Sequence, residues 1–280
     1  MPSPRAPTND SFAAHAVHDA RIRVGIGGWT YAPWRDNFYP AKLVQRRELE
    51  YASRHVTAIE VNGTYYGAQK PATYAKWRAE TPDGFMFSLK APRYTTDRRR
   101  LAEAGKTIAD FVGGGLAELD DRLGPINWQF PPYKPFERDD FAAFLDLLPN
   151  ELDGRALRHV LEVRHASFMC DEYLALARAH NAATVFTDSP KYPSFADVTG
   201  DFVYARLMGA QSSIATGYAP VSLDAWAERA RVWAEGGESV DLPCVGAPSA
   251  KRALREVFIY FISAAKERNP AAAMALLARL

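Results

Sequence analysis

Short apolar runs alternate along this chain with longer segments of helical periodicity, and this alternation constrains its fold more than any other feature. Eight runs have the length and composition of buried strands. These runs are Arg21–Gly27, Ala58–Asn62, Phe85–Lys90, Pro125–Phe130, His159–Arg164, Thr184–Asp188, Phe202–Leu207 and Val257–Ile262. The helical patterns are Gln45–Arg54, Pro71–Glu80, Thr107–Arg122, Arg138–Leu148, Asp171–His180, Leu223–Glu235 and Pro270–Leu280. Strands that alternate with helices predict parallel β-α-β units, and eight strands in about 260 residues predict an α/β fold, a single-domain (β/α)8 TIM barrel.

An open, doubly wound sheet is the alternative architecture. Such sheets commonly carry a GxGxxG sequence directly after a strand, and this chain has none in that position. We therefore expect the barrel domain to cover residues 21–280. Residues 1–20 are expected to form a flexible N-terminal leader, and Gly236–Arg255, which follows neither period, is expected to be an insertion before the last strand.

The balance of charges limits the partners of the protein. With 34 basic and 33 acidic side chains the net charge is +1, so the surface as a whole attracts neither nucleic acid nor an anionic membrane. A charged partner, nucleic acid included, would have to be met by a local patch. The apolar runs are too short to cross a bilayer, so no membrane partner is expected. The two cysteines build no disulfide framework and the first twenty residues lack a secretory signal, which predicts a cytoplasmic location and leaves the oligomeric state open.

Six charged side chains are expected at one end of the barrel. Alternate residues of a barrel strand face the lumen, and the functional site forms where the strands end. With that period, three carboxylates and three cations fall near the strand ends: Glu60, Glu162, Asp188, Lys90, Arg164 and Arg206. Because burying an unpaired charge costs several kcal/mol, we interpret the cluster as a ligand pocket. The alternative is a neutralising ion lattice that caps the barrel core.

Aromatic side chains gather in the loops after the first two expected strands. Those predicted to form a ligand wall are Trp29, Tyr31, Trp34, Tyr39 and Tyr65. Aromatic rings beside charged groups suit a sugar ring or a nucleobase. Further ligand contacts are expected from Asn62, Gln129 and Tyr260, which are in phase with the charged positions. The alternative is that the rings plug the barrel mouth and pack on the neighbouring helix.

Several blocks of the sequence resemble a known family. They are GGWTYAPWRDNFYP, YASRHVTAIEVNGTYY, TYAKWRAETPDGFMFSLKAP, LGPINWQFPP, LEVRHASF, YARLMG and VFIYF, in this order. The blocks are similar to those of the YecE-like family, also catalogued as domain of unknown function seventy-two. The resemblance implies a (β/α)8 barrel and brings no settled reaction. It implies a site at the positions named above, together with Tyr66, His165 and Gly209.

The chain departs from that family pattern at four places. Met208 stands where the family commonly has a histidine after the seventh strand, and Phe168 replaces a usual tryptophan. Ser263 and Ala264 replace a usual asparagine pair, and RYTTDRRR lacks the Thr-His pair expected after the third strand. The missing histidines weaken any mechanism that would use them as bases or metal ligands.

Two chemistries that need carboxylates fit the cluster less well. Carboxylates without histidines favour Mg²⁺ or Mn²⁺ over zinc, but the interleaved Lys90, Arg164 and Arg206 would repel a cation. We therefore expect no cofactor and no metal ligands, with Mg²⁺ or Mn²⁺ as the minor alternative. Glycoside hydrolysis would need Glu60 and Glu162 to flank one bond, and the neighbouring bases do not favour it.

An anionic ligand fits the cluster best. The candidate catalytic acids and bases are Glu60, Glu162 and Asp188, and the candidate anion clamps are Lys90, Arg164 and Arg206. We expect an enzyme, a hydrolase or a lyase, that acts on a phosphorylated or otherwise anionic sugar-like or nucleotide ligand. The alternative is a non-catalytic nucleic-acid-binding barrel that uses the aromatic wall and the basic loop around Arg98.

Overall fold

Eight parallel strands form a closed barrel in the computed structural model, which describes residues 19–248 and 252–280. The strands are β1 (Ile22–Gly27), β2 (Ala58–Val61), β3 (Met86–Lys90), β4 (Leu123–Gln129), β7 (His159–Glu162), β8 (Ala183–Thr187), β9 (Phe202–Leu207) and β10 (Glu256–Phe261). Each pairs with the next along the chain, and β10 closes the barrel by pairing with β1. The predicted single-domain (β/α)8 TIM barrel is confirmed.

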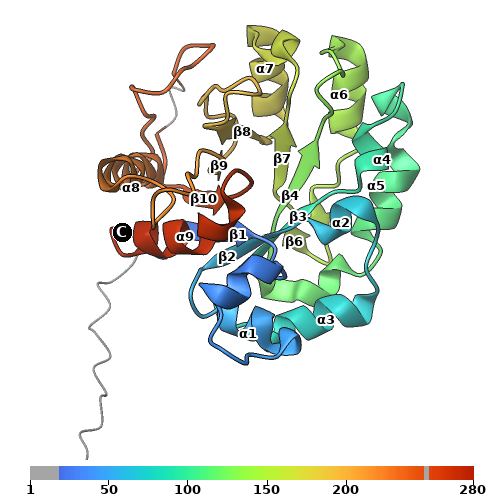
Figure 1. Cartoon of the computed structure of the whole chain (residues 1–280). Helices are drawn as coiled ribbons and strands as arrows, with labels where there is room; N and C mark the ends of the chain where they lie inside the picture. Colours follow the sequence, from blue (N-terminus) through green and yellow to red (C-terminus); the bar gives the residue numbers. More distant parts are fainter. Residues whose placement is uncertain (1–18, 249–251) are drawn as a thin grey trace, which may run out of the picture.

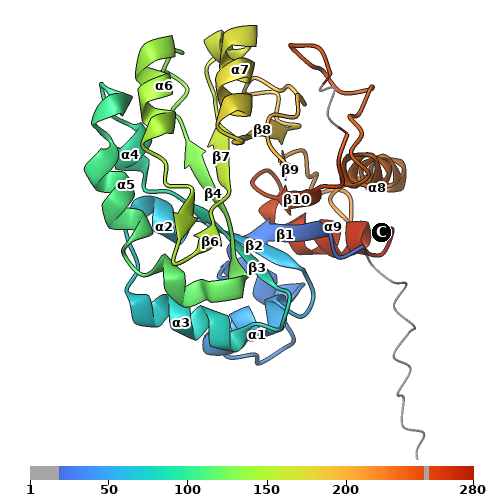
Figure 2. The ribbon, with the colours of Figure 1, turned by 180° about the vertical axis from the view of Figure 1, so that it is seen from behind.

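Helices surround the strands on the outside (Figure 1; Figure 2). They are α1 (Glu48–Ala52), α2 (Gly63–Tyr66), α3 (Pro71–Glu80), α4 (Arg93–Thr96), α5 (Gly105–Val112), α6 (Arg138–Asp146), α7 (Asp171–Ala179), α8 (Pro220–Ala234) and α9 (Asn269–Leu277). Short 3₁₀ turns are η1 (Ala32–Asp36), η2 (Gln45–Arg47), η3 (Leu101–Glu103), η4 (Leu116–Arg122), η5 (Ala166–Phe168) and η6 (Lys266–Arg268). A small antiparallel hairpin, β5 (Glu151–Leu152) with β6 (Arg155–Ala156), was not expected from the sequence.

The helix expected over Thr107–Arg122 is divided in two. Its first part is α5, and its second part is the 3₁₀ turn η4. The break falls at Gly115, whose φ of 116° is in the left-handed region that favours glycine. A Cβ at this position would lie 2.8 Å from the Pro71 ring at the start of α3. The close approach of α3 therefore needs a glycine where helical periodicity alone predicted continuity.

Two apolar cores lie on the two faces of the sheet. The larger fills the space between the strands and the helices and includes the fully buried rings of Trp34, Trp128 and Trp233. The smaller lies in the lumen and consists of Ala58, Val160, Ala183, Val185, Phe202, Tyr204, Phe258, Tyr260 and Ile262. The lumen is thus a packed core on which the charged residues at the strand ends rest.

The sixth expected strand was predicted to direct Asp188 toward the lumen, and this prediction is wrong. Val185 belongs to the lumen core, whereas the Phe186 ring packs 5.6 Å from the Trp226 ring and Thr184 bonds Tyr173 on the helix side. Each phase of β8 mixes apolar residues with a threonine, and all five residues are buried. The sequence of this strand therefore has no hydrophobic period from which the inward face could be read. Asp188, two residues after Phe186, consequently follows the helix-facing phase.

The expected insertion Gly236–Arg255 contains no helix or strand in its described residues. The Asp197 carboxylate holds it to the barrel by accepting hydrogen bonds from the Val245 and Gly246 amides, both at 2.8 Å. The expected leader lies outside the described residues except for Asp19 and Ala20. Within residues 19–248 and 252–280, no helix combines the length and apolarity needed to span a bilayer.

Candidate functional site

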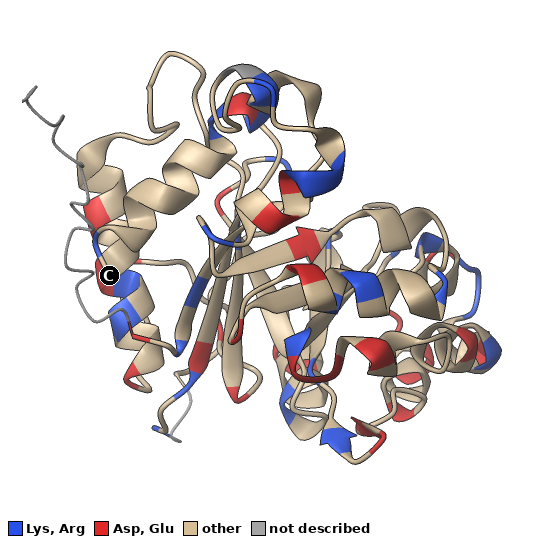
Figure 3. Ribbon diagram, turned by 90° about the horizontal axis from the view of Figure 1, so that it is seen from below, with Lys and Arg blue, Asp and Glu red and all other residues tan. Residues whose placement is uncertain are grey.

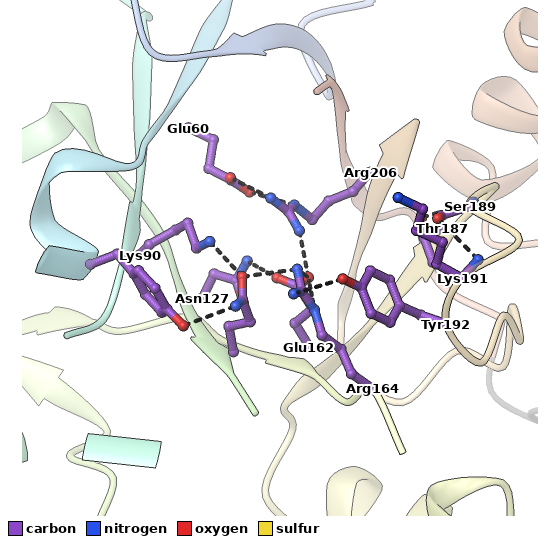
Figure 4. A network of polar contacts seen from close by, with 12 residues as sticks. Glu60, Lys90, Asn127, Glu162, Arg164, Thr187, Ser189, Lys191, Tyr192 and Arg206 are labelled. Carbon is purple, nitrogen blue, oxygen red and sulfur yellow. Dashed lines mark hydrogen bonds and ion pairs between the residues drawn. The ribbon is translucent and has the colours of Figure 1, made fainter. Parts of the chain in front are cut away.

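A buried arginine joins two carboxylates at the C-terminal end of the barrel (Figure 4). Arg206 on β9 donates from Nε and Nη2 to the two oxygens of Glu60 on β2, both at 3.0 Å. It also donates from Nη1 to Glu162 Oε1 on β7, at 2.5 Å. Glu60 is completely buried and Arg206 is 2% exposed. The alternation of inward and outward side chains along β2, β7 and β9 therefore brings three predicted residues together, buried at the C-terminal end of the lumen.

The Glu162 carboxylate is surrounded by donors. Oε1 also accepts from Arg164 Nε at 2.9 Å, and Oε2 accepts from Asn127 Nδ2 at 3.0 Å. Burial alone would raise the pKa of Glu162, but the charges of Arg206, Arg164 and Lys90 outweigh burial and lower it to about 2. Glu162 is thus ionised at all ordinary pH values, and its oxygens are already occupied.

Lys90 ends β3 beside this ion network and has a different environment. Its Nζ donates to Gln129 Oε1 at 2.5 Å and lies 4.3 Å from the centre of the Tyr65 ring. Among the described residues, no carboxylate lies within ion-pair distance of Nζ. Burial and the nearby Arg206 charge lower the pKa of Lys90 to about 8. Lys90 therefore changes its protonation near neutral pH, whereas Glu162 stays ionised there.

The cluster carries more positive than negative charge. We call Glu60, Lys90, Glu162, Arg164 and Arg206, with the amides Asn127 and Gln129, the rim lattice. It contains three cations and two carboxylates, linked by the hydrogen bonds above and by Arg164 Nη2 to Gln129 Oε1 at 3.0 Å. The loop after β8 lies against it, because Arg164 Nη1 donates to the Tyr192 hydroxyl at 3.3 Å (Figure 4).

Asp188 does not join the rim lattice, which corrects its predicted place. Its carboxylate accepts hydrogen bonds from the Met208 amide and, at 2.8 Å, from the Tyr218 hydroxyl. Tyr218 in turn accepts from the Gly209 amide at 2.7 Å. Asp188 therefore fastens the loop after β9, where the helix-facing phase of β8 has placed it. The expected balance of three acids against three bases becomes two against three.

Three residues expected to contact a ligand are instead buried in the two cores. The Trp34 ring is fully buried and donates from Nε1 to the Lys266 carbonyl at 2.8 Å. The Tyr39 side chain is buried and its hydroxyl donates to the Trp29 carbonyl. Tyr260 lies in the lumen core with no exposure. For these rings the packing alternative describes the structure, because the loop after β1 folds back on α1 and the barrel wall.

A pocket of about 330 Å³ opens beside the rim lattice where β1 and β2 end. The predicted Trp29 and Asn62 line it, together with residues that the sequence did not single out: Thr30, Gln69, Trp77 and Lys266. The predicted Tyr31 does not line the pocket but contacts a residue that does, because the Lys266 ammonium lies 4.5 Å from the centre of its ring. Trp77 comes from α3 and Lys266 from the loop after β10, so no strand period could have revealed them.

The basic loop and the histidines take up local roles. Arg98 donates to the carbonyls of Tyr94 and Glu103 and to the Thr107 hydroxyl, which fastens its own loop. The half-buried His165 bonds the Ser167 hydroxyl two residues later. In the described part of the chain, no three His, Cys, Asp or Glu side chains are placed to hold a metal ion together.

Comparisons with known proteins agree with this fold. The family model described as "Protein of unknown function DUF72" matches residues 23–280. A curated relative, the UPF0759 protein YunF of Bacillus subtilis (strain 168), is 26% identical over 126 residues. The match covers 43% of this chain and 44% of that protein, so the chain spans less than half the length of this relative.

Two solved structures of DUF72 family proteins share the architecture. One from Thermotoga maritima has a TM-score of 0.68 at 20% identity and covers 91% of this chain and 96% of its own. One from Enterococcus faecalis, at 2.52 Å resolution, has a TM-score of 0.65 at 16% identity and covers 94% and 97%. At such identities the likeness shows the shared barrel alone.

Proposed function

The chain belongs to the DUF72 family, and we propose that the C-terminal face of its barrel binds a small anionic ligand, a phosphorylated or carboxylated compound. The observation that carries the proposal is the surplus of cations in the rim lattice. Arg206 pairs with Glu60 and Glu162, and Arg164 pairs with Glu162. Lys90 therefore holds a buried charge with no described carboxylate within ion-pair distance. A buried charge of this kind is stabilised by an anion supplied from outside.

Lys90 and Arg164 are the groups suited to receive the anion. The Lys90 ammonium uses one of its donors on Gln129, which leaves donors for an oxyanion. Arg164 reaches the mouth of the site, with its side chain 14% exposed and its guanidinium 4.3 Å from the Tyr192 ring centre. A lysine and an arginine at one rim match the charge and hydrogen-bonding of phosphate or carboxylate. The role of anion clamp therefore passes from the deeply buried Arg206 to these two residues.

If the ligand is also transformed, Lys90 is the group suited to move its proton. A pKa of about 8 allows the Lys90 amine to accept and return a proton near neutral pH. Glu162, with a pKa of about 2, is a poor base. Glu60 already accepts from Arg206 and from the Tyr204 hydroxyl at 2.8 Å. In this proposal the two carboxylates hold the cations in place, and a hydrolase or lyase reaction would use Lys90.

The two alternative functions find less support in the geometry. A glycosidase needs space for the scissile bond between its two carboxyl groups, and the Arg206 guanidinium occupies the space between Glu60 and Glu162 (Figure 4). Nucleic acid would need a row of available cations, whereas Arg98 is committed to its own loop. Figure 3 shows Lys and Arg interspersed with Asp and Glu along the ribbon.

The proposal is tested by a thermal-shift panel at low salt. The panel sets inorganic phosphate, sugar phosphates, sugar acids and nucleotides beside neutral sugars and short single-stranded oligonucleotides. A ligand that binds only the folded state raises the melting temperature by mass action. We expect anionic small molecules to raise it, and the Lys90→Met variant to lose that response.

Lys106→Met is the matched control, because the Lys106 side chain is 84% exposed on α5 and pairs only with Asp110 in the described residues. It should respond to anions as the wild type does. An equal response of Lys90→Met and Lys106→Met would overturn the proposal. A response to oligonucleotides alone would favour the nucleic-acid alternative, and one to neutral sugars alone would favour a glycosidase.

A further inference from the structure

The pocket where β1 and β2 end adjoins the rim lattice through two neighbouring strand ends. Val61 of β2 pairs with Leu89 of β3, and the next residues of the two strands are Asn62, which lines the pocket, and Lys90. The Thr64 hydroxyl then bonds the Lys90 carbonyl at 2.7 Å. A ligand whose anionic group meets Lys90 would therefore extend past Asn62 into this pocket.

Several polar groups of the pocket have hydrogen-bonding capacity to spare. Within the described residues, no protein group forms a hydrogen bond with the side-chain amide of Asn62, the Thr30 hydroxyl or the Lys266 ammonium. The Gln69 side chain donates one weak hydrogen bond, from Nε2 to the Gly67 carbonyl at 3.4 Å, and its side-chain oxygen is left for other partners. These groups come from four different segments of the chain, so they surround the space from several directions.

Lys266 is held in place by its backbone. Trp34 Nε1 donates to its carbonyl at 2.8 Å, and Asn37 Nδ2 donates to the next carbonyl, that of Glu267, at 3.1 Å. The ammonium lies 4.5 Å and 5.6 Å from the ring centres of Tyr31 and Trp34. Trp34 and Tyr31 of the loop after β1 thus position a cation at the pocket.

Two indole rings supply the apolar part of the lining. Trp29 and Trp77 meet edge to face, with ring centres 5.1 Å apart and planes at 83°. This arrangement offers no parallel pair of rings that could sandwich a flat base. A nucleobase also presents its polar groups in a single plane, whereas the hydroxyls of a sugar point in several directions and its C–H surface packs on aromatic rings.

We propose that this pocket is the subsite for the hydroxyl-bearing part of the anionic ligand, which makes that ligand a sugar phosphate or sugar acid rather than a nucleotide. The inference rests on the proposed function, because the anionic group is assigned to Lys90. Asn62, Thr30 and Gln69 bind hydroxyls, Trp29 and Trp77 contact the carbon skeleton, and Lys266 donates to ligand oxygens.

Calorimetric titration of two variants tests the subsite separately from the anion site. The probes are inorganic phosphate, the 6-phosphates of glucose, mannose and fructose, gluconate, and adenosine monophosphate. We expect at least one sugar phosphate or gluconate to bind more tightly than phosphate. Asn62→Ala should weaken the binding of that compound roughly 10-fold, as the loss of about one hydrogen bond implies, and leave the affinity for phosphate unchanged. Lys90→Met should weaken both.

Asn150→Ala is the control, since Asn150 is exposed in the segment between α6 and β5, and it should change neither affinity. Trp77→Phe adds a second readout, because loss of an indole from the pocket should reduce the ligand-induced change in tryptophan fluorescence. The melting temperature of each variant is compared with that of the wild type, so a folding defect is seen directly.

The outcomes separate the two proposals. If phosphate binds through Lys90 but no sugar compound binds more tightly, or Asn62→Ala has no selective effect, the subsite is overturned and the anion site stands. Adenosine monophosphate binding above every sugar compound would also overturn the subsite. If Lys90→Met changes no affinity, the proposed function fails, and with it the inference that depends on it.

Discussion

Two carboxylates, the buried Glu162 and the half-buried Asp188, stand at the ends of consecutive strands, and their neighbours give them opposite properties. Glu162 ends β7 on the lumen side and meets the cations Arg164 and Arg206. Asp188 follows β8 on the helix side, and its hydrogen-bond donors among the described residues are neutral, the Met208 amide and the Tyr218 hydroxyl. The pKa of Glu162 is lowered to about 2, whereas burial raises that of Asp188 despite its hydrogen bonds.

The difference shows how the two faces of one sheet separate two tasks. On the lumen side, the carboxylates hold an excess of cations at the mouth of the barrel. On the helix side, a carboxylate at the end of the next strand fastens a loop by accepting hydrogen bonds from neutral groups. A charged residue at a strand end therefore indicates a site only when its phase is known. Four substitutions test this contrast.

Removing the shared cation should have the largest effect. Arg206→Met leaves Glu60 and Glu162 without their common partner, and breaking a buried pair costs about 3–5 kcal/mol. We expect the melting temperature to fall by roughly 10 °C, as measured by calorimetry. Arg99→Met, at an exposed position of the basic loop, should leave it unchanged. A fall of equal size in both variants would contradict the role given to the rim lattice.

The free energy of unfolding at acid pH should depend on Glu162. Its folded pKa of about 2 lies below the ordinary 4.5, so its contribution is fully present above pH 4.5 and is lost as the pH falls toward 2. That contribution is about 3 kcal/mol by linkage. Glu162→Gln should remove it, so the urea stability of this variant should vary less with pH in that window. Curves that stay parallel down to pH 2 would refute the assignment.

Lys90 should govern stability at alkaline pH, where its buried charge opposes folding instead of supporting it. Its folded pKa of about 8 lies below the ordinary 10.5, so between these values the unfolded chain binds more protons and wild-type stability rises with pH. Lys90→Met should lack this rise. Without ligand at pH 7 the variant should be more stable by about 2 kcal/mol, since an unmatched buried cation is gone. Denaturation at pH 7 and pH 10 measures both effects, and a destabilised variant at pH 7 would count against a surplus charge.

The smallest effect is expected at Asp188. Because its folded pKa is raised, the stability it contributes is present below the unfolded pKa and lost as the pH rises through the folded one. Asp188→Asn keeps an acceptor for the Met208 amide and removes the half-buried charge. We expect stability at pH 7 to change by less than about 1 kcal/mol and anion binding to persist in the thermal-shift panel. Loss of anion binding would return Asp188 to the site.

The sequence predicted the barrel and most of the rim lattice for one physical reason. Where a polar residue such as Glu60, Gln129 or Glu162 stands between apolar neighbours, a period of two identifies the inward face. The same reasoning failed for Asp188, because each phase of β8 mixes apolar residues with a threonine. Periodicity also carries no information about loops and long-range packing, so it could neither place Lys266 at the pocket nor exclude Trp34 from the ligand wall.

The pairing of Glu60 with Arg206 has a consequence for the order in which this chain is able to fold. The two residues are 146 positions apart in sequence, and Glu60 lies in a fully enclosed place. A folding intermediate that contains only the first half of the strands has no guanidinium for this carboxylate, so it must leave Glu60 hydrated and the lumen open. Packing of the lumen and closure of the ring are thereby tied to the arrival of β9, late in synthesis. Contacts between such distant segments slow folding and make it cooperative, and they discourage stable half-barrels.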